Sequence, residues 1–457
     1  MDVAVIGLGK LGSPMAAIFA SLGHNTIGVD MVPATVEKIN RLEPPVFEPG
    51  LKELLLQTGG RLRATSNLAE AVQNSRISFV IVPTPSEKNG SFSMKYAEAA
   101  AREIGFALLG RTDPHLVVLT STVMPGDTDA VFIKALESAS GQKVGSNIGV
   151  CYSPEFIALG TCIRDFLHPD LVLIGESDSA SGKLLADFYQ TLHQSNPGIS
   201  RMAIVNAEIT KISLNSFVTM KISFANMIAS ICENFPEGNV DDVTKALGHD
   251  SRIGAKYFRG SVSFGGPCFP RDNRALARLG MDLGKEMALP EATDKINNSQ
   301  LDRVLTIINN LDPRGLTVGI LGLAYKPGTN VVEKSFGIAL ADALAERGLP
   351  VIAHDFHARI PAVMSMNQDI EFTDSVEECC KRSDIIIVAL PCAEYGNLPR
   401  EVLCESKRPK VILDCWRLNK LSDFADVAKV IALGTGDVQK VANKSFSPPL
   451  VQPFKVS

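Results

Sequence analysis

The stretch that decides the fold is VAVIGLGKLG at residues 3–12, which is followed by SPMAAIFASLG. An apolar run that predicts a strand leads into Gly7, Gly9 and Gly12, and the residues after them have the composition of a helix. In this spacing the first glycine permits a tight turn, the second lets a pyrophosphate approach the backbone, and the third lets the helix pack on the strand. The stretch therefore predicts the first unit of a dinucleotide-binding domain.

Asp30 ends the next predicted strand, NTIGVD, about 20 residues beyond the start of the turn. An acid at this point accepts hydrogen bonds from the ribose hydroxyls of an adenosine and repels a 2′-phosphate, so the pattern favours NAD over NADP. The cofactor-binding residues that the turn itself predicts are Gly7, Gly9, Gly12 and Asp30. The alternative is a glycine-rich connection between strand and helix that holds no ligand.

Short apolar runs continue along the chain in two blocks. The first block includes ISFVIVPTP, LVVLTSTV and LVLIG, and the second includes LTVGILGLAYK, LPVIAHD and KVILDCW. Such runs, when they alternate with helical segments, are typical of parallel sheets covered on both faces. Between the blocks, the segment that starts NAEITKISLNSF at residue 206 has almost thirty residues without Gly or Pro and predicts a long helix.

The predicted fold class is α/β, with two Rossmann-like doubly wound domains joined by an all-helical central domain. The predicted divisions are an NAD-binding domain at 1–205, the helical central domain at 206–300, a C-terminal Rossmann-like domain at 301–434 and a flexible tail at 435–457. The tail prediction rests on SFSPPLVQP, which has no periodicity.

The composition argues against several classes of function. The 457 residues carry 45 basic and 50 acidic side chains, and this net charge of −5 gives no support for a nucleic-acid partner. The nine cysteines contain no CxxC pair, so they indicate neither a disulfide framework nor a zinc site and suit a reducing compartment. The seven histidines form no ligand pair, so no metal is expected.

No membrane segment is expected either. The chain begins MDVAVIGLG, with an acid where a secretory signal would carry basic residues, and this start indicates a strand. The most apolar helical stretch, 212–231, is interrupted by Asn215, Lys221 and Asn226. We therefore expect a cytoplasmic protein with no membrane and no nucleic-acid partner.

The sharpest chemical signal is FGGPCFPRD at residues 264–272. Pro270 suits the first turn of a helix, so Cys268 is expected at or just before that helix's N-terminus, where the helix dipole favours a thiolate. Asp272 would lie in the first turn, either as a cap or as a group that positions a base or a water. For Cys268 alone, a buried inert thiol and a nucleophile are both open.

Lys211 and Asn215 are four residues apart on the long helix and therefore share one face. Together they could hold an oxyanion, although a solvated stripe is the alternative. Thr122 in STVMPG and Glu155 in SPEF each follow a predicted strand, at the sheet edge where ligands bind in doubly wound folds.

By these motifs and their order along the chain, the sequence resembles the nucleotide-sugar 6-dehydrogenases. The members of this family act on UDP-glucose, GDP-mannose or UDP-N-acetylhexosamines. The resemblance runs from residue 1 to about 420 and rests on the ordered set GLGKLGSPMA, VFEPGLKELL (46–55), VPTP (82–85), STVMPG (121–126), SPEF (153–156), EITKISLNSF (208–217), SRIGAKYF (251–258), FGGPCFPRD and LGLAYKPGT (321–329). The opening motif alone also resembles the β-hydroxyacid dehydrogenases.

The resemblance implies a four-electron oxidation of a sugar C6 alcohol to a carboxylate with two NAD in succession. Cys268 matches the nucleophile that would hold a thiohemiacetal and then a thioester. The other catalytic residues that it implies are Lys211 and Asn215 for the oxyanion, Asp272 for proton or water, and Thr122 and Glu155 for hydrolysis.

The resemblance also implies a cofactor site, a substrate site and a homodimer in which Arg252 could come from the partner subunit. The implied cofactor-binding set adds Leu11, Thr84, Thr122 and Lys326 to the turn and Asp30. The implied substrate-binding set is Glu155, Lys211, Asn215, Arg252, Phe264, Gly265, Lys326 and Arg417. UDP-glucose is the first choice of substrate, and products of such enzymes feed polysaccharide or glycan assembly.

Several positions depart from the family pattern and leave the substrate open. Leu159 stands where a second acid is common, and Asn330, Val331 and Glu333 stand where two acids and an Arg are common. Arg271 replaces a Lys beside the thiol. Besides other sugar nucleotides, the alternatives are a two-electron β-hydroxyacid-type dehydrogenase and a non-catalytic NAD- or sugar-nucleotide-binding protein.

Overall fold

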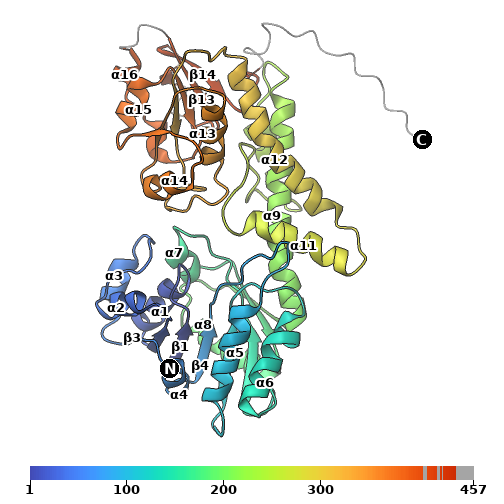
Figure 1. The fold of residues 1–457 in the computed structure, drawn as a ribbon. Coiled ribbons are helices and arrows are strands. Elements are labelled where there is room, and N and C mark those ends of the chain that lie inside the picture. Colours follow the sequence, from blue (N-terminus) through green and yellow to red (C-terminus); the bar gives the residue numbers. More distant parts are fainter. Residues whose placement is uncertain (405–408, 419–422, 425, 439–457) are drawn as a thin grey trace, which may run out of the picture. The chain divides into compact units, whose positions relative to one another are not determined.

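The computed structural model describes residues 1–404, 409–418, 423–424 and 426–438, which form two compact units (Figure 1). The first unit consists of Met1–Ser216 and Arg271–Ala288, and the second of Phe217–Pro270 and Leu289–Ser457. Helix α9 (Ile204–Cys232) starts in the first unit and ends in the second, and α11 (Phe269–Asp282) starts in the second and ends in the first.

The first unit, every residue of which is described, is built on an eight-stranded sheet in the order β3-β2-β1-β4-β5-β6-β7-β8. The strands are β1 (Asp2–Ile6), β2 (Asn25–Val29), β3 (Leu62–Thr65), β4 (Ile77–Val80), β5 (His115–Leu119), β6 (Ile148–Tyr152), β7 (Leu171–Glu176) and β8 (Gly198–Ala203). Neighbouring strands are parallel except β6 and β7, which pair antiparallel. The inner strands β4, β5 and β6 are apolar and largely buried because both faces of the sheet are covered, whereas the edge strands β3 and β8 have exposed positions.

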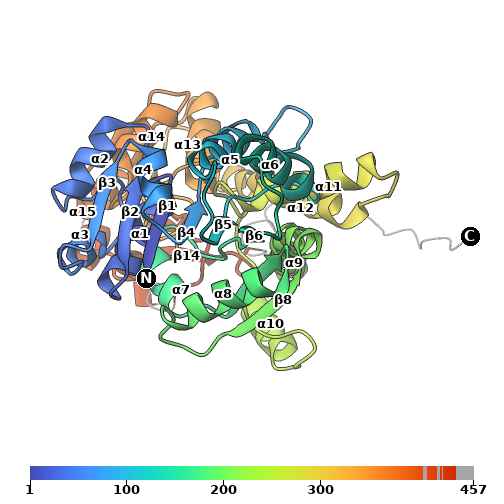
Figure 2. The same ribbon diagram turned by 90° about the horizontal axis from the view of Figure 1, so that it is seen from below.

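Helices cover both faces of this sheet, and Figure 2 shows α5 and α6 on one side and α7 and α8 on the other. One apolar core joins the strands to α1, α3, α7 and α8, and the other joins them to α4, α5 and α6. The helical elements of the unit before α9 are α1 (Gly12–Ser21), α2 (Pro33–Asn40), α3 (Leu51–Leu56), α4 (Leu68–Gln73), α5 (Lys95–Ala107), the π-helical η1 (Thr128–Ile133), α6 (Lys134–Ser140), α7 (Cys162–Leu167) and α8 (Ser179–Gln190).

The second unit contains, among its described residues, a six-stranded sheet in the order β11-β10-β9-β12-β13-β14. Each pair of neighbouring strands in this sheet is parallel. The strands are β9 (Val318–Leu321), β10 (Val351–His354), β11 (Glu371–Phe372), β12 (Ile385–Val388), β13 (Lys410–Asp414) and β14 (Ala428–Ala432).

The helices of the second unit also form two layers on its sheet. One core contains residues of α12 and α13, and the other contains residues of α15 and α16. Helix α12 lies beside α9 in Figure 1, and the hydroxyl of Ser223 donates to the carbonyl of Thr293 at 3.2 Å. The helical elements are α10 (Val240–Gly248), α12 (Ala288–Asn309), α13 (Phe336–Glu346), α14 (Arg359–Ser365), α15 (Val376–Arg382), η2 (Ala393–Gly396) and α16 (Arg400–Cys404).

The predicted fold class is confirmed, because two α/β sheets occur and the long helix predicted from residue 206 onward is α9. The antiparallel pairing of β6 with β7 was not predicted, and neither were β3, β8, β11 and β14. Of the predicted tail, Thr435 pairs with Asn239 in an isolated bridge, whereas residues 439–457 lie outside the described residues. In the described part of the chain, no helix is long and apolar enough to cross a membrane.

Candidate active site

The glycine turn after β1 has the steric requirements that its sequence predicts. Gly7 has a φ of +99°, and a Cβ there would lie 2.2 Å from the carbonyl oxygen of Ile81. A Cβ on Gly12 would lie 1.8 Å from the carbonyl oxygen of Gly7, so α1 can approach β1 only if this residue is glycine. A Cβ on Gly9 would meet no heavy atom within 4 Å. The turn therefore packs tightly at its two ends and is open in the middle, as a pyrophosphate-binding turn requires.

Asp30 lies directly after β2 and is held by the same turn. Its carboxylate accepts a hydrogen bond from the backbone N–H of Leu8 at 2.9 Å and one from Val32 at 2.8 Å. Both bonds fix the carboxylate beside the turn, where the ribose of an adenosine would lie. Leu11, the residue before α1, is partly exposed at the same place. These residues fit NAD.

The second sheet contains a turn of the same construction after β9. Gly322 has a φ of +107°, and a Cβ on Gly337 would lie 2.1 Å from its carbonyl oxygen. Asp355 follows β10 as Asp30 follows β2, but Ala324 stands where the first turn has Gly9. The Asp355 carboxylate accepts four backbone hydrogen bonds, from Leu323, Ala324, His357 and Ala358. This carboxylate is therefore saturated by the protein itself.

Two loops at the carboxyl edge of the first sheet are fastened to each other. The hydroxyl of Thr84, after β4, donates to the carbonyl of Thr122, after β5, at 2.7 Å. The hydroxyl of Ser121 donates to the carbonyl of Val82 at 2.7 Å and accepts from its N–H at 2.9 Å. The predicted residues Thr84 and Thr122 thus lie side by side at the edge where ligands bind in doubly wound sheets.

Lys211 projects from α9 to the loop that follows β6. Its ammonium donates to the carbonyl of Glu155 at 2.8 Å and lies 4.7 Å from the ring centroid of Phe156. The side chain is buried, with 7% of the residue exposed. This burial rules out the solvated stripe that the i, i+4 spacing left open. The structure places Lys211 and Glu155 together.

The surroundings of Glu155 favour the protonated, neutral form of its carboxyl more than bulk water does. Burial raises the pKa of its carboxyl to about 7, and the charge of Lys211 and a hydrogen bond from Tyr189 oppose that rise. A carboxyl with a pKa near 7 can both accept and give up a proton at neutral pH.

Asn215 and Asp272 form a buried pair. The side-chain amide of Asn215 donates to the Asp272 carboxylate at 2.6 Å, and Asp272 is 1% exposed in the first turn of α11. Arg271 lies 3.4 Å from the same carboxylate, donates to the carbonyl of Thr84 at 3.2 Å and stacks 4.4 Å from the ring centroid of Phe92. The carboxylate of Asp272 is therefore oriented by an amide and a guanidinium.

Cys268 directly precedes α11, as its sequence predicts, and its residue is exposed. Seven of the other cysteines are buried, and Cys404 is also exposed. Burial raises the pKa of the Cys379, Cys380 and Cys392 thiols to about 12, which makes them inert at neutral pH. Exposure at the start of a helix excludes the buried, inert alternative for Cys268.

The predicted substrate-binding residues of the second unit are packed in different ways. Phe264 exchanges two hydrogen bonds with the side chain of Asn297, and a Cβ on Gly265 would lie 2.2 Å from the carbonyl oxygen of Lys334. The N–H of Gly266 donates to the carbonyl of Glu333 at 2.9 Å. The segment with the unusual Glu333 thus supports the backbone at 264–266.

The three predicted basic residues of this unit differ in exposure. Lys326 is partly buried in the loop after β9. Arg252 is exposed, and its guanidinium pairs with Asp250 at 2.6 Å. Arg417 is 9% exposed, pairs with Asp241 at 2.8 Å and donates to the carbonyls of Gly260 and Leu433.

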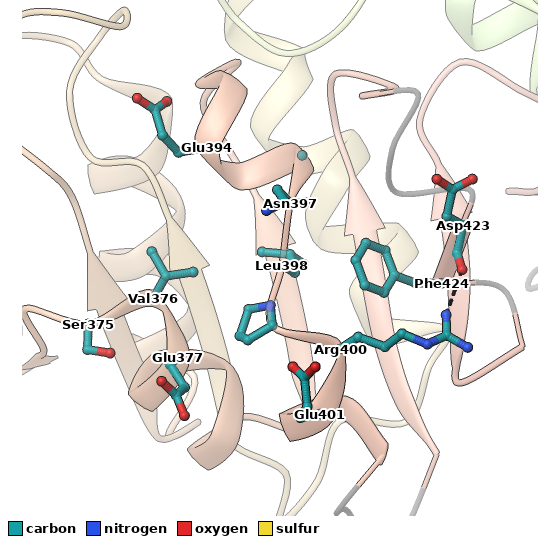
Figure 3. Close-up of a pocket in the computed structure, with 12 residues that line it drawn as sticks. Ser375, Val376, Glu377, Glu394, Asn397, Leu398, Arg400, Glu401, Asp423 and Phe424 are labelled. Atoms are coloured by element: carbon teal, nitrogen blue, oxygen red, sulfur yellow. Dashed lines mark hydrogen bonds between the residues drawn. The ribbon is translucent and has the colours of Figure 1, made fainter.

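A separate cavity of about 930 Å³ lies in the second unit (Figure 3). Its walls come from the segments around the starts of α15 and α16, with Val376, Leu398 and Phe424 among the apolar residues and Glu377 and Glu401 among the acids. None of the predicted site residues lines it. It is distinct from the residues discussed above.

Two buried carboxylates in the first unit escaped the sequence reasoning. Glu208 accepts hydrogen bonds from the N–H groups of Gly126 and Thr128, and Glu48 accepts from those of Gly160 and Cys162. Both lie inside quoted motifs, EITKISLNSF and VFEPGLKELL. An acid within an otherwise apolar motif is the signal that could have singled them out.

A dinucleotide turn with an acid after the second strand, a thiol at a helix start, a buried lysine and a buried Asn–Asp pair are features expected of an NAD-dependent dehydrogenase. Three family descriptions match in order: the UDP-glucose/GDP-mannose dehydrogenase family's NAD binding domain at 1–193, its central domain at 205–299 and its UDP binding domain at 319–420. The chain belongs to the UDP-glucose/GDP-mannose dehydrogenase family, which confirms the predicted resemblance and the NAD cofactor.

Individual relatives agree with this assignment. The UDP-glucose 6-dehydrogenase AglM of Haloferax volcanii is 34% identical over 428 residues, covering 92% of this chain and 97% of that protein. The GDP-mannose 6-dehydrogenase of Pseudomonas aeruginosa is 35% identical over 374 residues, covering 81% and 84%. A solved UDP-glucose dehydrogenase from Pyrobaculum islandicum superimposes with a TM-score of 0.84 at 33% identity, covering 95% of this chain and 97% of that chain.

Proposed function

We propose that the protein oxidises the C6 alcohol of a nucleotide sugar to the carboxylate, with UDP-glucose as the preferred substrate and UDP-glucuronate as the product. The observation that carries the proposal is the buried hydrogen bond from Asn215 of α9 to Asp272, which lies in the first turn of α11, the helix that Cys268 directly precedes. Bound NAD supplies the chemistry of hydride acceptance in each of the two oxidations.

In the first oxidation the chain's residues handle the hydroxyl proton and the developing charge. Asp272 accepts the C6 hydroxyl proton, directly or through one water, because its carboxylate is oriented by Asn215 and Arg271. The cation of Lys211 and the amide of Asn215 stabilise the oxygen as it becomes negative. The C6–H bond breaks, its hydride leaves, and an aldehyde remains.

In the second oxidation the Cys268 thiolate adds to the aldehyde carbon. A carbon–sulfur bond forms, and the carbonyl oxygen takes up the proton that Asp272 accepted in the first oxidation and becomes the hydroxyl of a thiohemiacetal. Loss of its proton and of a second hydride leaves a thioester. Water, positioned by Thr122 and deprotonated by Glu155, then adds to the thioester, the carbon–sulfur bond breaks, and the thiolate is regenerated with a free carboxylate. One alcohol, two NAD and one water yield one carboxylate, two NADH and three protons.

The nucleotide and diphosphate would be held by the second unit. We assign the backbone at Phe264 and Gly265, together with Lys326, Arg252 and Arg417, to the substrate, because the matching family domain is a UDP binding domain. Relatives that carry UDP-glucose in their names support the first choice. UDP-N-acetylhexosamines and GDP-mannose are the alternatives, since a GDP-mannose dehydrogenase is equally similar.

The decisive experiment is a panel of sugar nucleotides with NADH measured by absorbance and the product by mass. We expect two NADH per UDP-glucose and a uronic acid product. One NADH per sugar with an aldehyde released by the wild-type enzyme would contradict the proposal. Tight NAD binding with no NADH formed on any sugar nucleotide would favour the non-catalytic alternative.

The assembly that we propose is a homodimer centred on the predicted central domain, 206–300. Four large apolar side chains on the part of α9 in the second unit are exposed, namely Phe217 at 60%, Phe224 at 44%, Met227 at 44% and Ile231 at 55%. Such a stripe on one helix is typical of a covered interface. The exposed Arg252 would then be able to reach the sugar nucleotide of the partner subunit.

We also propose that the enzyme works in the cytoplasm and supplies uronic acid units for polysaccharide or glycan assembly. The proposal is supported by the cysteine pattern of the sequence, because the nine cysteines contain no CxxC pair and suit a reducing compartment. It is further supported by the substrate class, since sugar nucleotides are the activated donors from which glycans are built.

A further inference from the structure

Helix α9 also carries a buried acid, Glu208, on the side that bears Lys211 and Asn215. Glu208 is three residues before Lys211, so the two project from neighbouring turns of the same face. Its residue has no exposed surface. A buried carboxylate is costly unless donors surround it, so its contacts indicate what it does.

The donors to Glu208 come from the far end of the loop that carries Thr122. The N–H of Gly126 donates to one carboxylate oxygen at 2.6 Å, and the N–H of Thr128 donates to the other at 2.9 Å. Gly126 has a φ of +97°, a conformation that directs its N–H without side-chain strain. Burial raises the pKa of Glu208, and these N–H groups oppose that rise. The carboxylate therefore joins α9 to the end of loop 121–126 and the start of η1.

The near end of the same loop is held by different contacts. Thr84 bonds the carbonyl of Thr122, and Ser121 is bonded to Val82, as described above. In the middle, Met124 packs in a small apolar cluster with Ile212 of α9, Ala275 of α11 and Phe92. Loop 121–126 is thus fixed to β4 at one end and to α9 at the other.

The chemistry of the contact requires a carboxylate. Two N–H donors point at two separate oxygens, so an amide in place of the acid would offer one acceptor oxygen and turn an NH2 group toward the other donor. One backbone N–H would then lose its partner in a buried site. A shorter acid would keep the charge and lose reach by one methylene.

We propose that Glu208 is a positioning residue that sets the distance between Thr122 and the Lys211–Asn215 face of α9. The inference deepens the proposed function and rests on it, because the proposed hydrolysis gives Thr122 its role. Glu208 acts through loop 121–126 and does not itself touch the reacting atoms.

The test compares Glu208→Gln and Glu208→Asp with Glu137→Gln as the matched control. Glu137 also accepts a backbone N–H, that of Val144 at 3.0 Å, but on α6 away from the predicted site residues. Each variant is made in the wild-type and Thr122→Ala backgrounds. The measurements are kcat and KM for UDP-glucose and NAD, the dissociation constant for NADH by fluorescence, and the melting temperature.

We expect Glu208→Gln to lower kcat by about tenfold or more, Glu208→Asp to lower it less, and Glu137→Gln to leave it unchanged. In the Thr122→Ala background Glu208→Gln should add less than about twofold, because both changes act on one element. A melting temperature that falls without a change in kcat would overturn the proposal, as would equal losses in the two backgrounds. Failure of both Glu208 variants to fold would also overturn it, since the role would then be stability.

The outcome is separable from that of the proposed function. If the wild-type enzyme turns over no sugar nucleotide, the proposed function fails and the NADH dissociation constant decides the inference. A weaker NADH affinity in Glu208→Gln, with Glu137→Gln unchanged, would then support a role in placing the loop. An unchanged affinity in both would overturn it.

Discussion

At the level of single residues, the exposure of its thiol distinguishes Cys268 from the seven buried cysteines. Among the nine cysteines, all of them described, Cys404 is the other exposed thiol, and it is the last residue of α16. A helix start favours a thiolate and a helix end does not, so the two exposed thiols form a natural pair for comparison.

Replacing Cys268 by Ser should stop the enzyme after the first oxidation. We expect uronate formation to fall by roughly a thousandfold or more, because the oxygen nucleophile is far less reactive and no thioester can form. Product analysis by mass and NADH counting would measure it, with Cys404→Ser as the control that keeps full activity. Equal uronate yields from both variants would refute a covalent role for Cys268.

The protonation of Glu155 should make the rate of hydrolysis depend on pH. Glu155 has a pKa raised to about 7, so a larger fraction is protonated below that pH and a smaller fraction can serve as the base in hydrolysis. The rate of hydrolysis should therefore fall as the pH drops through 7 and level off above about pH 8. The pH profile of kcat measures this limb, which Glu155→Gln should remove together with most of the activity. Asp129→Asn, a change of an exposed carboxyl, should keep the limb in place.

At the level of secondary-structure elements, the two glycine turns are built alike but have different roles. The first turn has an open centre at Gly9 and an acid, Asp30, that accepts two backbone hydrogen bonds. The second turn has Ala324 in that place and an acid, Asp355, with four. The first acid can therefore accept further hydrogen bonds from a ribose, whereas the second is used by its own loops.

Parallel substitutions of the two acids should separate these roles. Asp30→Asn should raise the KM for NAD by about tenfold and change the melting temperature little, because a ligand contact is weakened. Asp355→Asn should leave that KM unchanged and lower the free energy of unfolding of the second unit by about 2–3 kcal/mol, because charge-assisted bonds to backbone N–H groups are lost. Steady-state kinetics and chemical denaturation measure the two effects. A raised KM in Asp355→Asn would contradict this division.

Sequence reasoning was successful where a feature is local in the chain. The steric demands at Gly7 and Gly12, the start of α11 after Cys268 and the shared helix of Lys211 and Asn215 all follow from spacings of a few residues. The antiparallel direction of β7 was not predictable in this way, because the direction of a strand leaves no mark on its apolar pattern. The partners of Asp272 and Glu208 lie 57 and about 80 residues away, and only the packed fold shows that they meet.

At the scale of the whole molecule, the exposed apolar stripe on α9 predicts the assembly. Phe224→Glu should convert a dimer to monomers, because it places a charge in a surface that two chains would cover. Sedimentation equilibrium would show about half the wild-type mass. Phe106, which is 66% exposed on α5, provides the matched control, and Phe106→Glu should leave the mass unchanged. A wild-type chain that is monomeric at micromolar concentration would contradict the proposed dimer.

Because the hydrogen bonds of the Asp355 carboxylate are all made by its own loops, the two units of the chain should tolerate different substitutions during evolution. Substitutions in the turn that binds a small molecule are selected against because the reaction is lost. Substitutions in the turn that contacts only its own backbone are selected against because stability is lost. A library of random variants sorted for thermal survival should therefore be depleted at position 355 and tolerant at position 30. The same library sorted for growth that depends on the reaction should lose variants at both positions.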